Sequence, residues 1–351
     1  MRPDILILGQ GLAGTMLAAE LERVGISFAI VDAGHASAAT PVAAGIVNPV
    51  TGRRIVKSWR IEALLPAARL AYRALEAQLE VPLWRELRVR RSFADARERD
   101  AALAKHARGE LAPYVETVDE SGFWIREAAR VDLSRLLQAA RARWTAAGAL
   151  RSERIELADA IGRHAVVIDC RGRATATGGT FPFVPWEFSK GELIELAVEG
   201  LDPDVILNRR HWVLPVAAQR AWVGATHEPG VMDTTPSEAA LGALTASARE
   251  LLGAERTFAV VGRRAGVRVQ LPDKRPIAGR HPDQPGLGLI NALGGKGVLW
   301  APLLARQWVN HLTEGVPFDV EVDVTRFGRQ AGAPAGRGGS AGGGGNGTTE
   351  K

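Results

Sequence analysis

Three glycines near the start of the chain have the spacing of a loop that binds a dinucleotide. Gly9, Gly11 and Gly14 form the pattern G-x-G-x-x-G, and Asp32 follows at close to the roughly 20-residue distance at which such loops have a carboxylate. The first glycine allows a sharp turn, the second lets a pyrophosphate approach the backbone, and the third lets a helix pack closely on a strand. The carboxylate of Asp32 would accept hydrogen bonds from an adenosine ribose.

These residues can act together only if a strand, a turn, a helix and a second strand position them. Residues 5–8 form a continuous apolar run, which is typical of a strand buried on both faces, and residues 12–24 are apolar at helical spacing. Residues 28–31 predict the second strand, which Asp32 follows. The diphosphate would lie against Leu12 and Ala13 at the helix N-terminus, where free N–H groups and the helix dipole favour an anion.

The glycine pattern alone leaves two questions open. An α/β crossover can carry such glycines for packing alone, although it does not require an acid at residue 32. NAD and FAD share this fingerprint, so the motif does not choose between them.

The composition is that of an ordinary globular protein, with 351 residues, 46% hydrophobic and 24% charged. No apolar run approaches the roughly 18 residues of a transmembrane helix, so we expect no membrane span. The single cysteine, Cys170, excludes an internal disulfide and a cysteine-cluster metal site, and it is better explained as a small buried residue than as a nucleophile. No His, Asp or Glu spacing indicates a metal. A reducing cytoplasm is the simplest compartment.

Basic residues exceed acidic ones, but they do not gather into one region. The net charge of +5 comes from arginines that are spread along the chain and interleaved with acids. This distribution does not favour a nucleic-acid partner.

The order of the predicted elements indicates a discontinuous two-domain α/β protein. Residues 164–172 predict a further buried strand that ends at Gly172, so the sheet opened by residues 5–8 is entered again. Short alternating segments between residues 188 and 261 predict an antiparallel sheet, with one helix at 237–252. Ala43, Ala44 and Gly45 suggest backbone that passes close to a flat ring, or else a mobile loop.

We predict a Rossmann-type dinucleotide-binding domain and a mostly antiparallel α+β substrate domain. The first would comprise residues 1–80, 130–180 and 262–325, and the second residues 81–129 and 181–261. The glycine-rich residues 328–351 are predicted to be disordered.

Several blocks resemble, in chain order, the FAD-dependent D-amino-acid-oxidase-type superfamily, which includes glycine oxidase and sarcosine oxidase. Beside the N-terminal fingerprint they are Val167-Ile-Asp-Cys-Arg-Gly172, Lys190-Gly-Glu192, Val223-Gly-Ala-Thr226, Gly266-Val-Arg-Val-Gln-Leu-Pro-Asp-Lys-Arg-Pro276 and Gly294-Gly-Lys-Gly297 with Ala301-Pro302. Ala43-Ala-Gly-Ile-Val-Asn-Pro49 and residues 294–302 look more like the oxidase domain of the bifunctional enzyme that processes carboxymethylaminomethyl groups on tRNA wobble uridine. The resemblance spans residues 1–315, matches poorly from 60 to 130, and implies noncovalent FAD at the junction of the two domains.

The resemblance also assigns roles to individual residues. Arg268 stands where glycine-oxidase-like members have the arginine that binds the substrate carboxylate, for which a guanidinium offers a rigid two-pronged donor. Trp212 stands where relatives often have a pocket tyrosine, so a phenolic hydrogen bond to the substrate is lost. Gly294, Gly295 and Gly297 would face the flavin pyrimidine, where the helix N-terminus and Lys296 would stabilise negative charge. Each of these side chains also has a purely structural interpretation.

The predicted activity is oxidation of the C–N bond of a small amino acid or secondary amine to an imine, by hydride transfer to flavin N5. Such chemistry depends on alignment rather than on an acid–base pair, and the sequence has no evident pair. His227 either lines the pocket or is a loop histidine with its hydrogen bonds satisfied. Two alternatives stay open, namely the same oxidation on a modified tRNA side chain and a flavoprotein without amine oxidase activity.

Overall fold

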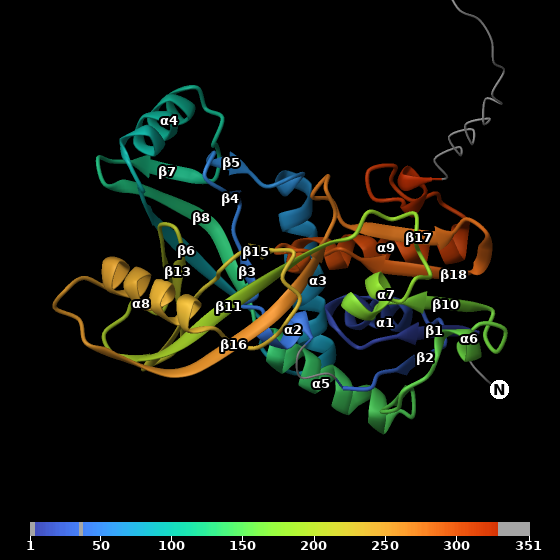
Figure 1. The fold of residues 1–351 in the computed structure, drawn as a ribbon. Coiled ribbons are helices and arrows are strands. Elements are labelled where there is room, and N and C mark those ends of the chain that lie inside the picture. The colour runs from blue at the N-terminus through green and yellow to red at the C-terminus, as the bar shows by residue number, and fades with distance from the viewer. Residues whose placement is uncertain (1–3, 35–37, 329–351) are drawn as a thin grey trace, which may run out of the picture.

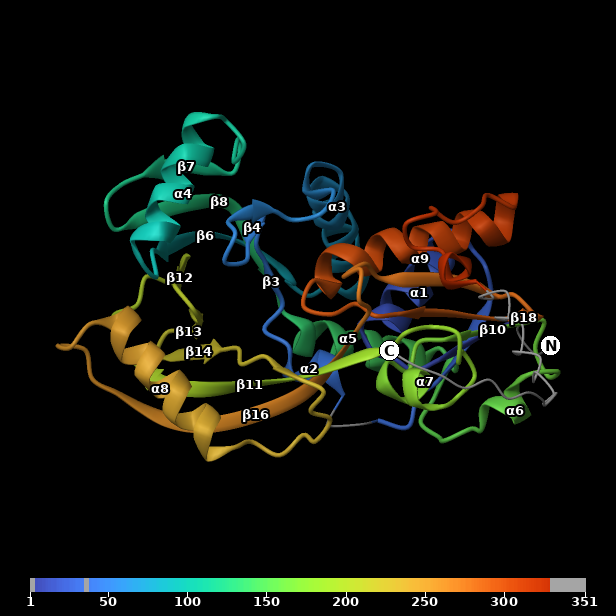
Figure 2. The same cartoon turned by 45° about the horizontal axis from the view of Figure 1, so that its top comes forward.

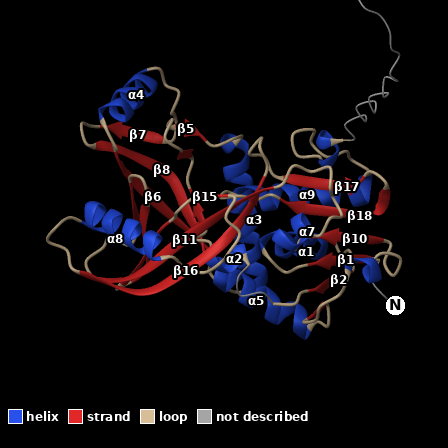
Figure 3. Cartoon of the chain, in the orientation of Figure 1, coloured by secondary structure: helices blue, strands red, loops and turns tan. Residues whose placement is uncertain are grey.

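The computed structural model describes residues 4–34 and 38–328. In this part of the chain, two large β-sheets lie side by side, and helices pack on both of them (Figure 1; strands red and helices blue in Figure 3). The predicted disordered tail lies outside the described residues except for Gly328.

The first sheet, which we call the parallel sheet, has the strand order β17-β18-β10-β1-β2-β9. Its central strand β1 (Ile5–Leu8) pairs in parallel with β2 (Phe28–Val31) and with β10 (Val166–Asp169). The expected return of the chain to this sheet is therefore confirmed. The remaining strands are β9 (Leu150–Arg151), β17 (Ile277–His281) and β18 (Gln284–Asn291), of which β17 runs antiparallel to β18.

Burial on both faces explains the continuous apolar run of β1. Ile5 and Ile7 belong to the core beneath the helices α1 (Leu12–Arg23) and α9 (Gly297–Glu314), whereas Leu6 and Leu8 belong to a separate core on the other face. A strand in such a position has no solvent-facing side that would require alternating polar residues.

The second sheet, which we call the curled sheet, contains ten strands and is antiparallel except where β12 pairs with β6. Its strands are β3 (Ile46–Val47), β6 (Trp84–Ser92), β7 (Val115–Val118), β8 (Gly122–Val131), β11 (Glu187–Val198), β12 (Val205–Asn208), β13 (Trp212–Ala217), β14 (Arg220–Gly224), β15 (Glu228–Pro229) and β16 (Phe258–Gln270). A small hairpin joins β4 (Val50–Thr51) to β5 (Val56–Lys57). The antiparallel sheet predicted between residues 188 and 261 is thus present.

The other helices are α2 (Ala39–Val42), α3 (Ile61–Leu79), α4 (Ala96–Ala107), α5 (Leu133–Ala146), α6 (Leu157–Ala160), α7 (Arg173–Thr177) and α8 (Glu238–Leu252), and a 3₁₀ turn spans Val324–Phe327. Asp132 caps α5 by accepting a hydrogen bond from Arg135 N, and Ser237 caps α8 in the same way from Ala240 N. Asp and Ser are among the residue types that favour this position at a helix N-terminus.

Helix α8 covers one face of the curled sheet and leaves the other face directed toward the rest of the molecule (Figure 2). Along β11, Ile194, Leu196 and Val198 pack with Leu244 of α8. The alternating residues of β11 and β16, including Gly191 and Arg268, therefore lie on the opposite face, which we call the inner face.

The long strand β16 pairs with β11 over residues 258–270. Residues 262–270, which the predicted domain division assigns to the dinucleotide-binding part, are thus strand residues of the curled sheet. The division of the chain into domains stays a prediction.

Candidate active site

The glycine fingerprint forms a tight turn between β1 and α1. Gly9 has a φ of +95°, which favours glycine, and its N–H donates to the Val31 carbonyl oxygen at 2.8 Å. A Cβ atom added to Gly14 would overlap the Gly9 carbonyl oxygen. The packing role expected for the third glycine is therefore present at this turn.

The N-terminus of α1 has the donors that an anion needs. Leu12 N donates to Thr40 Oγ1 at 3.1 Å, whereas the N–H groups of Gly11 and Ala13 have no acceptor among the described residues. Gly11 is the N-cap residue, and no side chain caps the helix there. Free N–H groups beside a glycine turn are the arrangement that binds a phosphate, so the residues present fit a dinucleotide cofactor.

Asp32 lies beside this turn and is held by several donors. Its Oδ2 accepts from Gln10 N at 2.8 Å, and its Oδ1 accepts from Arg141 Nη1 at 2.9 Å. Arg141 also donates to Gln10 Oε1 at 2.8 Å, so it fixes the orientation of the carboxylate. Arg141 is not among the predicted site residues, because it lies 109 residues from Asp32 and no local pattern links the two.

The other predicted cofactor-binding segments converge on the same edge of the parallel sheet. A Cβ on Gly45, whose φ is +73°, would overlap the Val131 carbonyl oxygen, so residues 43–45 run against the end of β8. The Gly172 carbonyl oxygen accepts from Asn291 Nδ2 at 2.9 Å, which joins the ends of β10 and β18. This edge holds the carboxyl ends of the parallel strands, where α/β proteins bind their ligands.

The loop of Gly294, Gly295, Lys296 and Gly297 connects this edge to the inner face of the curled sheet. Gly294 N donates to the Val269 carbonyl oxygen at 3.0 Å, and a Cβ on Gly297 would lie 3.2 Å from Leu12 Cδ2. The N-termini of α1 and α9 therefore approach each other beside the end of β16.

Arg268 lies flat on the inner face. A Cβ added to Gly191, on the neighbouring strand, would overlap its guanidinium, so the absence of a side chain at 191 makes room for it. Arg268 Nη1 donates to the Thr226 carbonyl oxygen at 3.2 Å, and no carboxylate of a described residue lies within 4.0 Å of the guanidinium. Burial lowers the pKa of Arg268. A largely buried cation without an anion beside it is costly, so this position favours an anionic ligand.

Lys296 is a second partly buried cation of the same kind. Burial, followed by the positive charge of Arg275, lowers the pKa of Lys296. Its ammonium group makes no ion pair within the described ranges, whereas Arg275 lies 3.4 Å from Glu321. The N-terminus of α9, which Lys296 caps, adds further positive potential at this position.

Trp212 and His227 also belong to the inner-face region. The Trp212 ring lies over Gly224, where an added Cβ would be 2.8 Å from Trp212 Cζ2. His227 Nδ1 is 2.7 Å from Ser189 Oγ, and Ser189 faces Arg268 across the strand pair. Burial, then the charges of Arg268 and Lys274, lower the pKa of His227.

The lowered pKa of His227 predicts a loss of stability on mild acidification. In the unfolded chain, His227 binds a proton as the pH falls below its ordinary pKa of about 6.5, whereas in the folded chain it binds one only at a lower pH. The free energy of unfolding therefore falls as the pH falls from about 6.5 toward the lowered pKa. Chemical unfolding at about pH 7.5 and about pH 5.5 should show a smaller decrease for His227→Asn than for the natural protein. Equal decreases in the two proteins would contradict this assignment.

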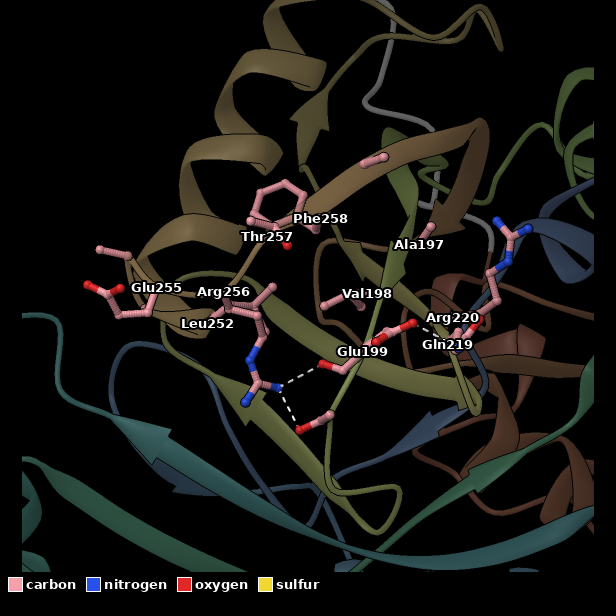
Figure 4. A pocket seen from close by; sticks show the side chains of 14 residues that line it. Ala197, Val198, Glu199, Gln219, Arg220, Leu252, Glu255, Arg256, Thr257 and Phe258 are labelled. Carbon is pink, nitrogen blue, oxygen red and sulfur yellow. Dashed lines mark hydrogen bonds between the residues drawn. The ribbon is translucent and has the colours of Figure 1, made fainter.

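A wide hollow of about 1120 Å³ lies elsewhere, at the far end of the curled sheet (Figure 4). It is lined by residues 197–200 at the end of β11 and by residues 252–259 after α8. Arg256 donates there to the carbonyl oxygens of Glu199 and Gly200. Ser189 and Arg268 lie at the opposite end of the β11–β16 pair, so this hollow is separate from the predicted site.

Three further features concern the described residues, 4–34 and 38–328. Cys170 is buried, and burial raises the pKa of its thiol, so it is a poor nucleophile. No group of His, Cys, Asp and Glu side chains there could hold a metal ion. No helix in the described ranges is long and apolar enough to cross a membrane.

Residues 4–310 match the family model described as FAD dependent oxidoreductase. The chain belongs to this family. It is therefore an FAD-dependent enzyme, and the family membership decides between the two cofactors that the glycine motif left open.

Curated relatives match over long stretches. The tRNA 5-methylaminomethyl-2-thiouridine biosynthesis bifunctional protein MnmC of Maricaulis maris is 31% identical over 344 residues, which are 94% of this chain and 54% of that protein. The glycine oxidase of Pseudomonas putida is 32% identical over 135 residues, which are 38% of this chain and 37% of that protein. The chain thus spans about half the length of the bifunctional relative that it matches.

Solved structures share the fold. Iminodiacetate oxidase from Chelativorans sp. BNC1 superposes with a TM-score of 0.74 at 22% identity, over 91% of this chain and 98% of that chain. Glycine oxidase from Geobacillus kaustophilus gives a TM-score of 0.71 at 21% identity, over 91% and 97% of the two chains. Both are α/β structures of the kind that the sequence predicts, so the predicted fold class is confirmed.

Proposed function

We propose that this oxidoreductase oxidises the C–N bond of an amine that carries a carboxylate, such as a small amino acid or a secondary amine derived from one. The observation that carries this proposal is Arg268, a largely buried guanidinium on the inner face with no carboxylate partner among the described residues. A substrate carboxylate would supply the missing anion through paired, charge-assisted hydrogen bonds.

Bound FAD supplies the chemistry in this proposal, because it accepts the hydride from the carbon next to nitrogen. The residues of the chain bind and orient. The N–H groups of Gly11 and Ala13 at the start of α1 would hold the pyrophosphate, and Asp32 would hold the ribose. Arg268 would fix the carboxylate so that the C–H bond is aligned. Lys296 and the N-terminus of α9 would supply positive charge beside the cofactor, which would favour its acceptance of electrons.

Partly buried cations also favour the neutral form of the amine, which is the form that can lose a hydride. Arg268 and Lys296 both raise the local positive potential, and His227 is neutral near pH 7 because its pKa is lowered. An ammonium group would be repelled at this position. No residue of the chain is required to act as a general base in the oxidation itself.

A second candidate function is the same oxidation on an amine side chain of tRNA. The observation in its favour is the 31% identity to the bifunctional tRNA-modifying protein of Maricaulis maris over 94% of this chain. Glycine oxidase matches a shorter stretch, 38% of the chain. Both candidates require an amine and flavin chemistry, so they differ only in what is attached to the amine.

The visible spectrum of the purified holoenzyme without oxygen tests the proposal. We expect bleaching of the flavin band by at least one of glycine, sarcosine, proline, D-amino acids or an N-carboxymethyl amine with a longer substituent. A flavin that stays oxidised with this whole panel, but is reduced by dithionite, would reject the small-amine proposal. Reduction by tRNA that carries carboxymethylaminomethyl groups would then support the second candidate.

A further inference from the structure

The inner face holds a group of arginines around Trp222 that the proposed reaction does not use. Arg264 of β16 lies over the Trp222 ring at 4.2 Å, and Arg130 of β8 lies over it at 5.1 Å. The strands β8 and β16 stand far apart in the order of the curled sheet, so the curl of the sheet brings them together. Trp222 is buried, with 8% of its surface exposed.

The positive charge of this group is only partly balanced. Arg85 faces Arg130 directly across the β6–β8 pair, and like charges in that position destabilise a sheet. Arg130 lies 3.7 Å from Asp132. The guanidinium of Arg264 lies 3.3 Å from the carboxylate of Glu195, and the guanidinium of Arg220 lies 3.9 Å from the same carboxylate.

Buried donors in the group are also without acceptors. Arg130 is 9% exposed, and its Nε has no hydrogen-bond partner within the described ranges; the same holds for the Nε of Arg85. Arg85 Nη2 donates to the Pro215 carbonyl oxygen at 2.8 Å, and Arg85 makes no ion pair there. Burial and the neighbouring guanidinium groups lower the pKa of Arg130. Buried arginine N–H groups without hydrogen-bond acceptors fit an anionic ligand, which the chain itself does not supply.

This arginine group, Arg85, Arg130 and Arg264, lies on the same face as Arg268. Arg264 and Arg268 are both on the inner face of β16, and four residues of a strand span about 13 Å. Gly266 lies between them on that face, and Val42 of α2 packs against it, with the Val42 Cβ 3.3 Å from the position of an added Cβ. A substrate that reaches both sites must therefore carry two acidic groups on the order of 10 Å apart.

We propose that Arg130 and Arg264, beside Trp222, form a subsite for a phosphate group at the far end of the substrate. This inference rests on the proposed function, because it names what is attached to the amine that Arg268 holds. Glycine, sarcosine and other small amino acids are too short to reach the subsite. An amine attached to a nucleotide has the required length and the required second anion, and guanidinium groups bind phosphate well.

A pair of synthetic amines tests the subsite. N-(6-phosphonohexyl)glycine and N-hexylglycine have the same carboxylate, amine and chain, and only the first ends in an anion. For the natural holoenzyme we expect kcat/KM for anaerobic flavin reduction to be at least about tenfold higher with the phosphonate, through a lower KM. Arg264→Met should abolish this preference, so that its kcat/KM values for the two amines become equal.

Arg263→Met is the matched control. Arg263 is the neighbouring residue on β16, its side chain is 28% exposed against 31% for Arg264, and it lies on the α8 face, where it pairs with Glu238. This variant should keep the preference for the phosphonate. Equal kcat/KM values for the two amines in the natural enzyme, or a preference that survives Arg264→Met, would overturn the subsite.

Direct binding separates failure of the subsite from failure of the proposed function. If neither these two amines nor any amine of the panel above reduces the flavin, the proposed function fails, and the subsite is judged by calorimetric titration of the holoenzyme with inorganic phosphate. Binding to the natural protein and to Arg263→Met, but not to Arg264→Met, supports the subsite, whereas no binding to the natural protein overturns it.

Two competitors identify the source of the phosphate. If the phosphate belongs to a free nucleotide, uridine monophosphate should inhibit oxidation of the phosphonate more strongly than tRNA does. If it belongs to RNA, tRNA should inhibit at the lower concentration, and the inhibition should weaken with added salt. Inhibition by neither would contradict the phosphate assignment.

Discussion

Arg268→Ala is expected to lower kcat/KM for an N-carboxymethyl amine by on the order of 10²-fold, because a charge-assisted hydrogen bond to a buried group contributes roughly 1.5–3 kcal/mol. The guanidinium lies flat over Gly191 and has only the Thr226 carbonyl oxygen as an acceptor among the described residues. Its remaining donors are therefore available to a ligand. Stopped-flow reduction of the flavin without oxygen measures the effect.

A substrate without a carboxylate provides the control for Arg268. The matching amine that lacks the carboxylate should have a low kcat/KM with the natural enzyme. Arg268→Ala should have a similarly low kcat/KM with both compounds. Arg268→Lys keeps the charge and loses the two-pronged geometry, so its kcat/KM should fall between those of the other two proteins. Equal losses with both substrates in Arg268→Ala would show that the residue acts on the structure and not on the carboxylate.

Gly14→Ala should remove most of the bound FAD and destabilise the fold. The added Cβ would overlap the carbonyl oxygen of Gly9, a backbone atom that cannot move without opening the turn between β1 and α1. Overpacking of this kind costs typically about 1–3 kcal/mol. The flavin content of the purified protein and the free energy of unfolding of the apoprotein measure the two effects.

Gly242→Ala is the matched control for this substitution. Gly242 lies inside helix α8, and a Cβ added there meets nothing within 4 Å. Alanine should therefore raise the free energy of unfolding by about 0.5–1 kcal/mol and leave the flavin content unchanged. A Gly14→Ala protein that binds FAD as well as Gly242→Ala does would show that close packing at the turn is not required.

Local patterns predicted most of the elements correctly. The apolar run of β1 and the glycine turn both depend on residues within a few positions of one another. The resemblance of several sequence blocks to known members indicated the family, which the family model confirms for residues 4–310. The roles of Arg268, Trp212, Lys296 and the cofactor-binding glycines stay predictions.

The sequence by itself therefore determined the fold class, the dinucleotide fingerprint and the family, because each of these depends on short patterns of contiguous residues. Only the tertiary structure decided which distant residues meet. The ion pair of Arg141 with Asp32 joins residues 109 positions apart, and Gly191 makes room for Arg268 across a strand pair. The contacts of Arg130 and Arg264 with Trp222 depend on the curl of the sheet. Sheet curvature arises from packing over the whole domain, so no local pattern of residues specifies it.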